Sequence, residues 1–248
     1  MHEPILSGPM DHPLLGRVVG VDFSPKKVCS YDCVYCGVGM NTTRKTLERE
    51  MFLPVDALVD AIDRFTGEHE VPDTFFLTGS GEPMLYAGFG ETAVRLQDRY
   101  PSAAQTVYTN GSLLGDPLVR REIARCDPIQ GNLDGAEEAS FLRLSRPHRD
   151  TSIADRIEGF KALKRELDGQ QLWLHGVFVK GFNDGGDDLR ALGDALAEIG
   201  PDLFIVRTTG RVIEGLCEPV GAGFRAFVDD VWADLAIPLE FNLPEPQG

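Results

Sequence analysis

Hydrophobic residues follow two alternating patterns along this chain of 248 residues. Short apolar runs rich in β-branched and aromatic residues predict strands, and the segments between them repeat apolar residues with helical spacing. Residues 55–65, for example, are apolar at positions 55, 58, 59, 62 and 65. The predicted strands are 17–23, 74–78, 105–109, 128–133, 171–180 and 203–207, and the predicted helices are 55–65, 91–100, 117–125, 136–144, 152–167 and 187–199.

Strands that alternate with helices pair in parallel through right-handed crossovers. Six such units are fewer than the eight of a closed barrel, and polar or glycine-rich residues follow each of the six strands. The pattern therefore predicts an α/β fold, a partial (β/α)6 TIM-like barrel with its site at the carboxyl ends of the parallel strands. A doubly wound sheet is the alternative, and it would concentrate the polar residues at one switch point.

The whole chain, 1–248, is expected to form a single domain, because no low-complexity linker interrupts this pattern. Residues 1–15 form a short N-terminal extension rich in proline and glycine, and residues 16–211 form the partial barrel core. Residues 212–248 form a C-terminal tail, in which the pattern predicts a helix at 224–235 and an edge strand at 237–241.

Three of the five cysteines lie within eight residues, directly after the first predicted strand. A structural zinc site or a complete iron–sulfur cluster takes four protein ligands, so Cys29, Cys33 and Cys36 leave one position open. An open position is typical of catalytic metal sites, and an iron–sulfur cluster fits this run best. The alternatives are a zinc site completed by a distant His or Cys, and three buried cysteines on one helical face.

Charge and hydropathy exclude several classes of function. Lys and Arg total 24 against 39 Asp and Glu, so the formal net charge is −15 and nonspecific nucleic-acid binding is disfavoured. The chain has neither a run of about eighteen apolar residues nor a basic N-terminus followed by an apolar run. The clustered, odd number of cysteines does not form a disulfide framework. We therefore expect a cytoplasmic protein without a membrane span.

A second motif follows the second predicted strand, the turn Gly-Ser-Gly-Glu-Pro at 79–83. Together with the cysteine motif Cys-x3-Cys-x2-Cys and the segments 109–114, 146–148 and 179–184, it resembles the radical S-adenosylmethionine (SAM) superfamily. Within that superfamily, the chain looks most similar to iron–sulfur oxidoreductases related to the radical enzymes of wybutosine synthesis. The resemblance extends over residues 16–184.

The resemblance implies a [4Fe-4S] cluster on Cys29, Cys33 and Cys36, whose fourth iron binds the amino and carboxylate groups of SAM. An electron from an external donor, of the flavodoxin or ferredoxin type, would cleave SAM to a 5′-deoxyadenosyl radical that abstracts hydrogen from an unidentified substrate. Activation of a glycyl-radical enzyme fits the same motifs. A non-catalytic electron-transfer or sensor protein and a zinc-binding interaction module are alternatives of other classes.

The resemblance also implies SAM contacts. Tyr35 matches a position that packs on adenine, and the 79–83 turn matches one whose carbonyls receive the methionyl ammonium, where glycine permits close approach. Asn110, Asn132 and Asp134 would contact ribose or carboxylate, although each could instead stabilise a turn. Lys180, Asn183 and Arg207, at the ends of the last two predicted core strands, would hold the methionyl carboxylate or an anionic substrate. The candidates are Tyr35, Gly79, Ser80, Gly81, Glu82, Pro83, Asn110, Asn132, Asp134, Lys180, Asn183 and Arg207.

The remaining titratable residues have a structural interpretation. His148 and His175 are expected to be satisfied structural histidines, and Cys126 and Cys217 are expected to be small core residues. Substrate specificity is expected in the N-terminal extension, the loop 41–50 and the tail after residue 211.

Overall fold

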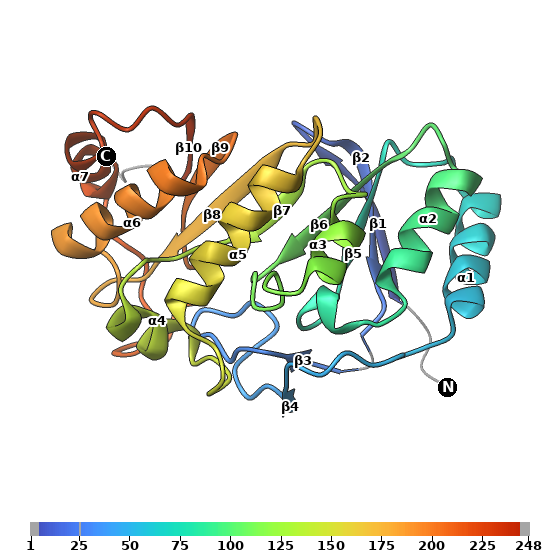
Figure 1. The fold of residues 1–248 in the computed structure, drawn as a ribbon, viewed down its shortest axis with the longest axis horizontal. Helices are drawn as coiled ribbons and strands as arrows, with labels where there is room; N and C mark the ends of the chain where they lie inside the picture. Colours follow the sequence, from blue (N-terminus) through green and yellow to red (C-terminus); the bar gives the residue numbers. More distant parts are fainter. Residues whose placement is uncertain (1–4, 25, 244–248) are drawn as a thin grey trace.

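The computed structural model describes residues 5–24 and 26–243, and eight strands form its main sheet (Figure 1). The strands lie in chain order, and all neighbouring pairs are parallel except the first, which is antiparallel. They are β1 (Ile5–His12), β2 (Gly16–Asp22), β5 (Thr74–Thr78), β6 (Ala104–Thr109), β7 (Ile129–Asn132), β8 (Leu172–Phe178), β9 (Leu203–Thr208) and β10 (Leu239–Asn242). Two short strands, β3 (Val28–Cys29) and β4 (Arg44–Lys45), pair separately.

The helices lie on one side of this sheet, in front of it in Figure 1. They are α1 (Val55–Glu68), α2 (Phe89–Arg99), α3 (Pro117–Ile123), α4 (Glu138–Ser145), α5 (Ile153–Glu166), α6 (Gly186–Ile199) and α7 (Phe224–Val231), with a short 3-10 helix η1 (Pro83–Leu85). The six predicted strand–helix units are all present, and they differ from the prediction only at their ends. The fold is the predicted partial TIM-like barrel, with β10 as its predicted edge strand.

The N-terminal extension forms a strand that the sequence pattern does not predict. β1 pairs antiparallel with β2, and its register shifts between Ser7 and Met10. Pro9 lies at this irregularity, where a strand tolerates proline because the ladder is already interrupted. Most side chains of β1 are exposed, so the apolar alternation that identifies a strand in sequence is missing. Among the described residues, the main sheet therefore has eight strands, one more than the six core strands and the edge strand that the sequence predicts.

Alternate side chains of the parallel strands point to opposite faces of the sheet. Leu77, Val107 and Leu174 are fully buried in the core that the sheet shares with the helices. Phe76, Tyr108 and His175, which precede or follow them by one residue, line a common cavity. One face of the sheet is thus packed against helices, and the other faces the interior of the partial barrel.

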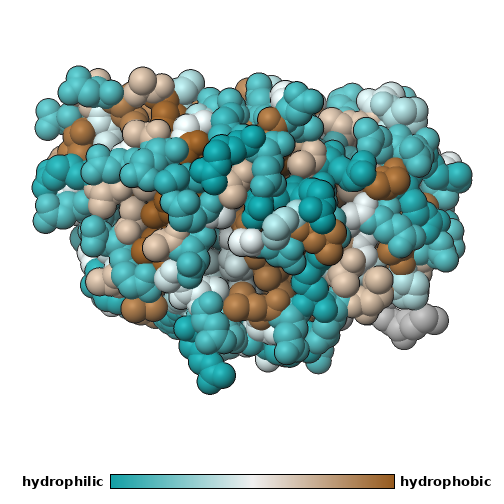
Figure 2. Space-filling view, in the orientation of Figure 1, coloured by the Kyte–Doolittle hydropathy of each residue, from teal (hydrophilic) through white to brown (hydrophobic). Residues whose placement is uncertain are grey.

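The helix-covered side is polar on its surface. Hydrophilic side chains occupy most of this face, and the apolar ones between them form small separate groups (Figure 2). Within residues 5–24 and 26–243, no helix combines the length and the apolar character that crossing a membrane requires.

Candidate functional site

The cysteine loop follows β2 and lies across the carboxyl ends of the strands, with β3 and β4 along the lower edge in Figure 1. Backbone hydrogen bonds attach it to two other segments. Asp32 N–H donates to the Ser145 carbonyl (3.0 Å) and Val34 N–H to the Leu144 carbonyl (2.9 Å), both at the end of α4. On the other side, Glu82 N–H donates to the Val28 carbonyl (3.1 Å). The loop is therefore held between α4 and the turn after β5.

Cys29, Cys33 and Cys36 are partly exposed and unpaired with other cysteines. Burial raises the pKa of the Cys29 thiol to about 12 and raises the pKa of Cys33 as well, because a thiolate without a cation loses its hydration there. Coordination to iron stabilises a thiolate that has lost its hydration, and thiolates are the ligands of iron–sulfur clusters. The donor set therefore fits a cluster.

The three sulfur atoms are not gathered around one point. In the part of the chain that the structure describes, no three Cys, His, Asp or Glu side chains form a ligand set for a single metal ion. A mononuclear zinc site would need its sulfurs about 3.8 Å apart, because Zn–S bonds are about 2.3 Å long. A four-iron cluster instead takes each sulfur on a different iron.

The 79–83 turn is built against the cysteine loop. Ser80 donates from its hydroxyl to Asp22 Oδ2 (2.5 Å) and from its backbone N–H to Asp22 Oδ1 (3.1 Å), which ties the turn to the end of β2. A Cβ atom on Gly81 would lie 1.7 Å from the carbonyl oxygen of Val28. Glycine at this position therefore permits the close approach of the cysteine loop, a function that the sequence analysis assigns only to ligand contact.

Glu82 is 1% exposed, and protein groups already occupy its carboxylate. Oε1 accepts from the Thr109 hydroxyl (2.6 Å) and the Met84 N–H (3.0 Å), and Oε2 accepts from the Asn110 N–H (2.8 Å). Burial raises the pKa of Glu82, although these donors favour its ionised form. Glu82 thus joins the turn after β5 to the end of β6.

Asn110 lies beside the first cysteine. Its amide Nδ2 donates to Ser30 Oγ (2.8 Å) and lies 3.6 Å from Cys29 Sγ, and its Oδ1 accepts from the Ser112 N–H (2.9 Å). The structure therefore brings Asn110 to the cysteine loop, and it also gives Asn110 the turn-stabilising role that the sequence leaves open.

Tyr35 of the cysteine loop forms one cluster with Asn132 and Asp134 at the end of β7. The Tyr35 hydroxyl donates to Asp134 Oδ2 (2.5 Å) and lies 3.1 Å from Asn132 Oδ1, while Asn132 Nδ2 donates to Asp134 Oδ1 (2.7 Å). Asn132 and Asp134 are 4% and 3% exposed. Burial raises the pKa of Asp134. The three residues meet in space although about a hundred positions separate Tyr35 from the other two.

Arg156, on α5, belongs to this cluster and is missed by the sequence analysis. Its guanidinium donates to the Asn132 carbonyl and to Asn132 Oδ1 (2.9 Å), and it lies over the rings of Tyr31 (5.4 Å) and Phe141 (5.5 Å). Arg156 is only 2% exposed, and its positive charge stabilises the carboxylate of Asp134. No motif surrounds it, so an arginine at a buried position of the helix pattern is the single signal that could have identified it.

The three predicted residues at the ends of the last strands have different environments. Lys180 is exposed and pairs with Glu218 (3.2 Å). Asn183 is 1% exposed and uses both amide protons within the fold, donating to the carbonyls of Asp134 (2.7 Å) and Val177 (3.0 Å). Arg207 lines the cavity inside the barrel. The structure therefore does not bring these three side chains together.

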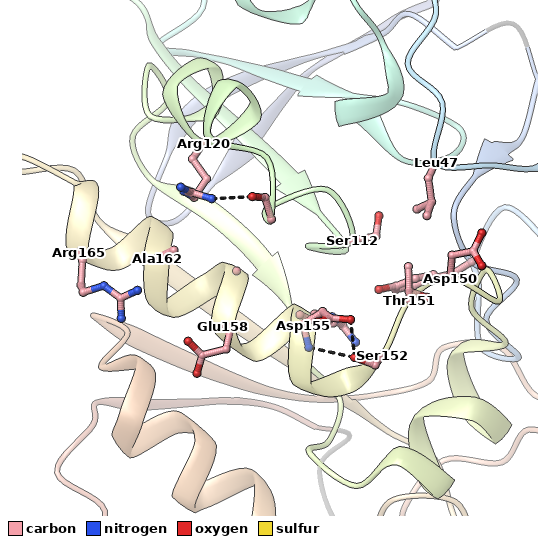
Figure 3. A pocket seen from close by; sticks show the side chains of 14 residues that line it. Leu47, Ser112, Arg120, Asp150, Thr151, Ser152, Asp155, Glu158, Ala162 and Arg165 are labelled. Carbon is pink, nitrogen blue, oxygen red and sulfur yellow. Dashed lines mark hydrogen bonds between the residues drawn. The ribbon is translucent and has the colours of Figure 1, made fainter.

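A second cleft, of about 450 Å³, lies outside the barrel between α3 and α5 (Figure 3). Two of its lining groups are held within the fold: Arg120 donates to both carboxylate oxygens of Glu166 (3.0 and 2.9 Å), and Ser152 caps α5 through the Asp155 N–H (3.1 Å). Among the described residues that line this cleft, none belongs to the predicted site.

Comparison with known proteins decides the family. A model of the radical SAM superfamily matches residues 23–192. The chain belongs to the radical SAM superfamily. Its matching segment includes the three-cysteine loop and the 79–83 turn, and the cofactors of this family are a [4Fe-4S] cluster and SAM.

The chain is also similar to individual proteins of known sequence or structure. A UPF0026 protein of Helicobacter pylori is 30% identical over 199 residues, which are 79% of this chain and 63% of the relative. A radical SAM methyltransferase from Sphaerobacter thermophilus has the same fold, with a TM-score of 0.67 at 18% identity over 99% of this chain and 70% of that one. The archaeal TYW1 structure gives a TM-score of 0.60 at 12% identity, over 88% and 72%. The chain spans less than two thirds of the length of its Helicobacter relative.

Proposed function

We propose that this chain is a radical SAM enzyme, which cleaves SAM at a [4Fe-4S] cluster and abstracts hydrogen from a substrate. The observation that carries the proposal is the docking of the three-cysteine loop on the 79–83 turn, at the carboxyl ends of parallel strands. Barrel enzymes keep their active sites at this end of the strands. A zinc module or an electron-transfer protein would not need a SAM-binding turn there.

In this proposal Cys29, Cys33 and Cys36 hold the cluster. Three thiolate ligands leave one iron without a protein ligand, where a small molecule can bind. When bound, the cluster and SAM supply the one-electron chemistry that generates the hydrogen-abstracting radical. The chain itself binds and orients both cofactors.

The SAM contacts that we propose divide between the methionyl end and the adenosine end of SAM. The backbone of the 79–83 turn, with Gly79, Ser80, Gly81 and Pro83, binds the methionyl end, because Asp22 and the cysteine loop hold this turn in one conformation. Tyr35, Asn132 and Asp134 bind the adenosine end, because their hydroxyl, amide and carboxylate groups meet at one place. Asn110, beside Cys29, lies between the two ends.

Glu82 and Asn183 act as positioning residues in this proposal, because their polar atoms are bound within the fold. Glu82 holds the turn against β6, and Asn183 holds the Asp134 carbonyl. Lys180 must break its ion pair with Glu218 before it can bind an anion. Arg207 faces the interior of the barrel, which is the place for a substrate.

The proposed partners follow from the family chemistry. Radical SAM enzymes need a reductant and a substrate, and we propose a flavodoxin- or ferredoxin-type electron donor. We also propose a cytoplasmic location, since such donors and an exposed three-cysteine cluster require a reducing compartment. The acidic composition disfavours nonspecific nucleic-acid binding.

We further propose that the chain belongs with the iron–sulfur oxidoreductases related to the radical enzymes of wybutosine synthesis. Support comes from the motifs between residues 16 and 184, and the similarity to archaeal TYW1 supports the shared fold. The substrate is not carried over from that group.

Anaerobic reconstitution with iron and sulfide tests the enzyme proposal. We expect about four irons per chain, an electron paramagnetic resonance signal of the reduced cluster that changes when SAM is added, and release of 5′-deoxyadenosine. Cys33→Ala should lose the iron and all SAM cleavage. Cys126→Ala is the matched control, because that cysteine is buried in the core away from the loop. A cluster that is indifferent to SAM would refute the proposal.

A further inference from the structure

The interior of the barrel contains a cavity of about 320 Å³, within the size range of small-molecule sites. Residues of both edge strands, β1 and β10, and of the inner sheet face between them line it. Phe76 and Trp173 supply flat apolar walls, and the polar lining residues include Tyr108, Gln130, His175 and Arg207. The backbone of His175 connects the cavity lining to the proposed cofactor site, because its carbonyl accepts hydrogen bonds from the Leu133 N–H (2.7 Å) and from Asn132 Nδ2 (3.4 Å).

A chain of hydrogen bonds across β6, β7 and β8 determines which nitrogen of His175 carries the proton. The Pro128 carbonyl can only accept, so the Thr106 hydroxyl donates to it (2.6 Å). The Thr106 oxygen then accepts from the amide nitrogen of Gln130 (2.9 Å), which turns Gln130 Oε1 toward His175. Oε1 can only accept, so His175 Nε2 donates to it (3.1 Å). The other ring nitrogen, Nδ1, is consequently an acceptor.

This acceptor has no partner. His175 is 5% exposed, and within the described residues no group donates to its buried Nδ1 atom. Burial, with help from the positive charge of Arg207, lowers the pKa of His175 to about 3, so the ring is neutral at physiological pH. The expectation of a satisfied structural histidine is thus met at Nε2, which binds Gln130, but not at Nδ1, and a buried acceptor without a donor is unfavourable unless another molecule completes it.

Arg207 is the cation of the cavity. Its side chain makes no hydrogen bond or ion pair with residues 5–24 or 26–243, and it stands one strand away from His175 and two residues further along. This register separates the two Cα atoms by roughly 8 Å, from a rise of about 3.3 Å per residue and a strand spacing of about 4.8 Å. The acidic lining residues Asp11 and Glu240 are exposed at the rim.

We propose that this cavity binds a small ring-containing molecule that donates an O–H or N–H hydrogen bond to His175 Nδ1 and places an anionic group on Arg207. Tyr108, whose ring centroid lies 5.0 Å from that of His175, and the walls of Phe76 and Trp173 contact the ring of the ligand. The binding site follows from the cavity alone. That the bound molecule is the substrate rests on the proposed function.

The tautomer gives a test that needs no ligand. Long-range 1H–15N spectra of the cluster-loaded protein labelled with 15N-histidine should show a histidine protonated only on Nε2, and His175→Phe should remove that signal. A His175 protonated on Nδ1 would overturn the proposal, because the acceptor would not exist.

Binding is tested with 4-hydroxybenzoate, which carries the donor and the anion at opposite ends of one ring. We expect saturable binding to the cluster-loaded protein in calorimetry, about tenfold weaker for 4-methoxybenzoate, which lacks the donor, and for Arg207→Gln. Arg190→Gln is the charge-matched control, because that exposed residue of α6 pairs with Asp187 on the surface, away from the cavity lining. Absence of saturable binding in the millimolar range, or equal binding of the methoxy analogue, would overturn the proposal.

The two proposals fail separately. SAM cleavage is measured on the same preparations without 4-hydroxybenzoate. Cleavage without binding of the probe refutes the cavity proposal and leaves the enzyme proposal intact. Binding without cleavage supports the cavity and refutes the enzyme proposal.

Discussion

Replacing Gly81 by alanine should separate the 79–83 turn from the cysteine loop. The new Cβ atom would lie 1.7 Å from the Val28 carbonyl oxygen, whereas real Cβ atoms stay at least 3.0 Å away, so one of the two backbones must move by about 1.3 Å. Neither side of the contact is a flexible side chain that could yield. The shift would also break the hydrogen bond from the Glu82 N–H to the same carbonyl (3.1 Å).

The expected loss of stability combines two effects. Forcing extra volume into a packed site costs about 1–3 kcal/mol, and a lost hydrogen bond costs about 0.5–1.5 kcal/mol. Gly81→Ala should therefore lower the free energy of unfolding by about 2–4 kcal/mol, the sum of those ranges with partial relaxation. Because the loop carries Cys29, Cys33 and Cys36, the displaced loop should also take up less iron.

Urea unfolding of the metal-free chain and iron analysis after reconstitution measure the two effects. Gly115→Ala is the matched control, because its Cβ atom would meet nothing within 4 Å. Equal free energies of unfolding and equal iron contents for the two variants would refute the inference that Gly81 exists to dock the cysteine loop.

Three other changes test the buried polar groups. Arg156→Met should lower the free energy of unfolding by about 1–3 kcal/mol, measured in urea, because the oxygen atoms of Asn132 lose their donor. Asn183→Ala should cost at least about 2 kcal/mol, because it removes three buried hydrogen bonds, whereas the exposed Lys180→Ala should stay within about 0.5 kcal/mol. Equal losses would contradict the burial of Asn183. The pKa of His175 is lowered in the folded state, so its contribution to stability is complete above its unfolded pKa of about 6.5. That contribution falls as the pH drops from about 6.5 toward 3, and unfolding measured across this range should be less acid-sensitive in His175→Phe.

The sequence predicts the alternating strands and helices of the core because those strands are buried on both faces and the helices on one. Burial on both faces gives a strand a short continuous apolar run, as in Thr74–Thr78, and burial on one face gives a helix a hydrophobic period, as in Val55–Glu68. The sequence does not predict β1, because an edge strand with exposed side chains and an internal proline shows no hydrophobic pattern. Its backbone pairs with β2 all the same, since hydrogen bonds to an open sheet edge do not depend on side chains.

The sequence by itself determined the proposed cluster ligands and the order of the motifs. Cys29, Cys33 and Cys36 lie within eight residues, and a local motif keeps its spacing in any fold. Only the tertiary structure decided which distant groups meet these motifs: Val28 against Gly81, Tyr35 against Asp134, and Arg156 behind Asn132. The same holds for the unpartnered nitrogen of His175, because whether a buried polar atom finds a partner depends on neighbouring strands and not on neighbouring residues.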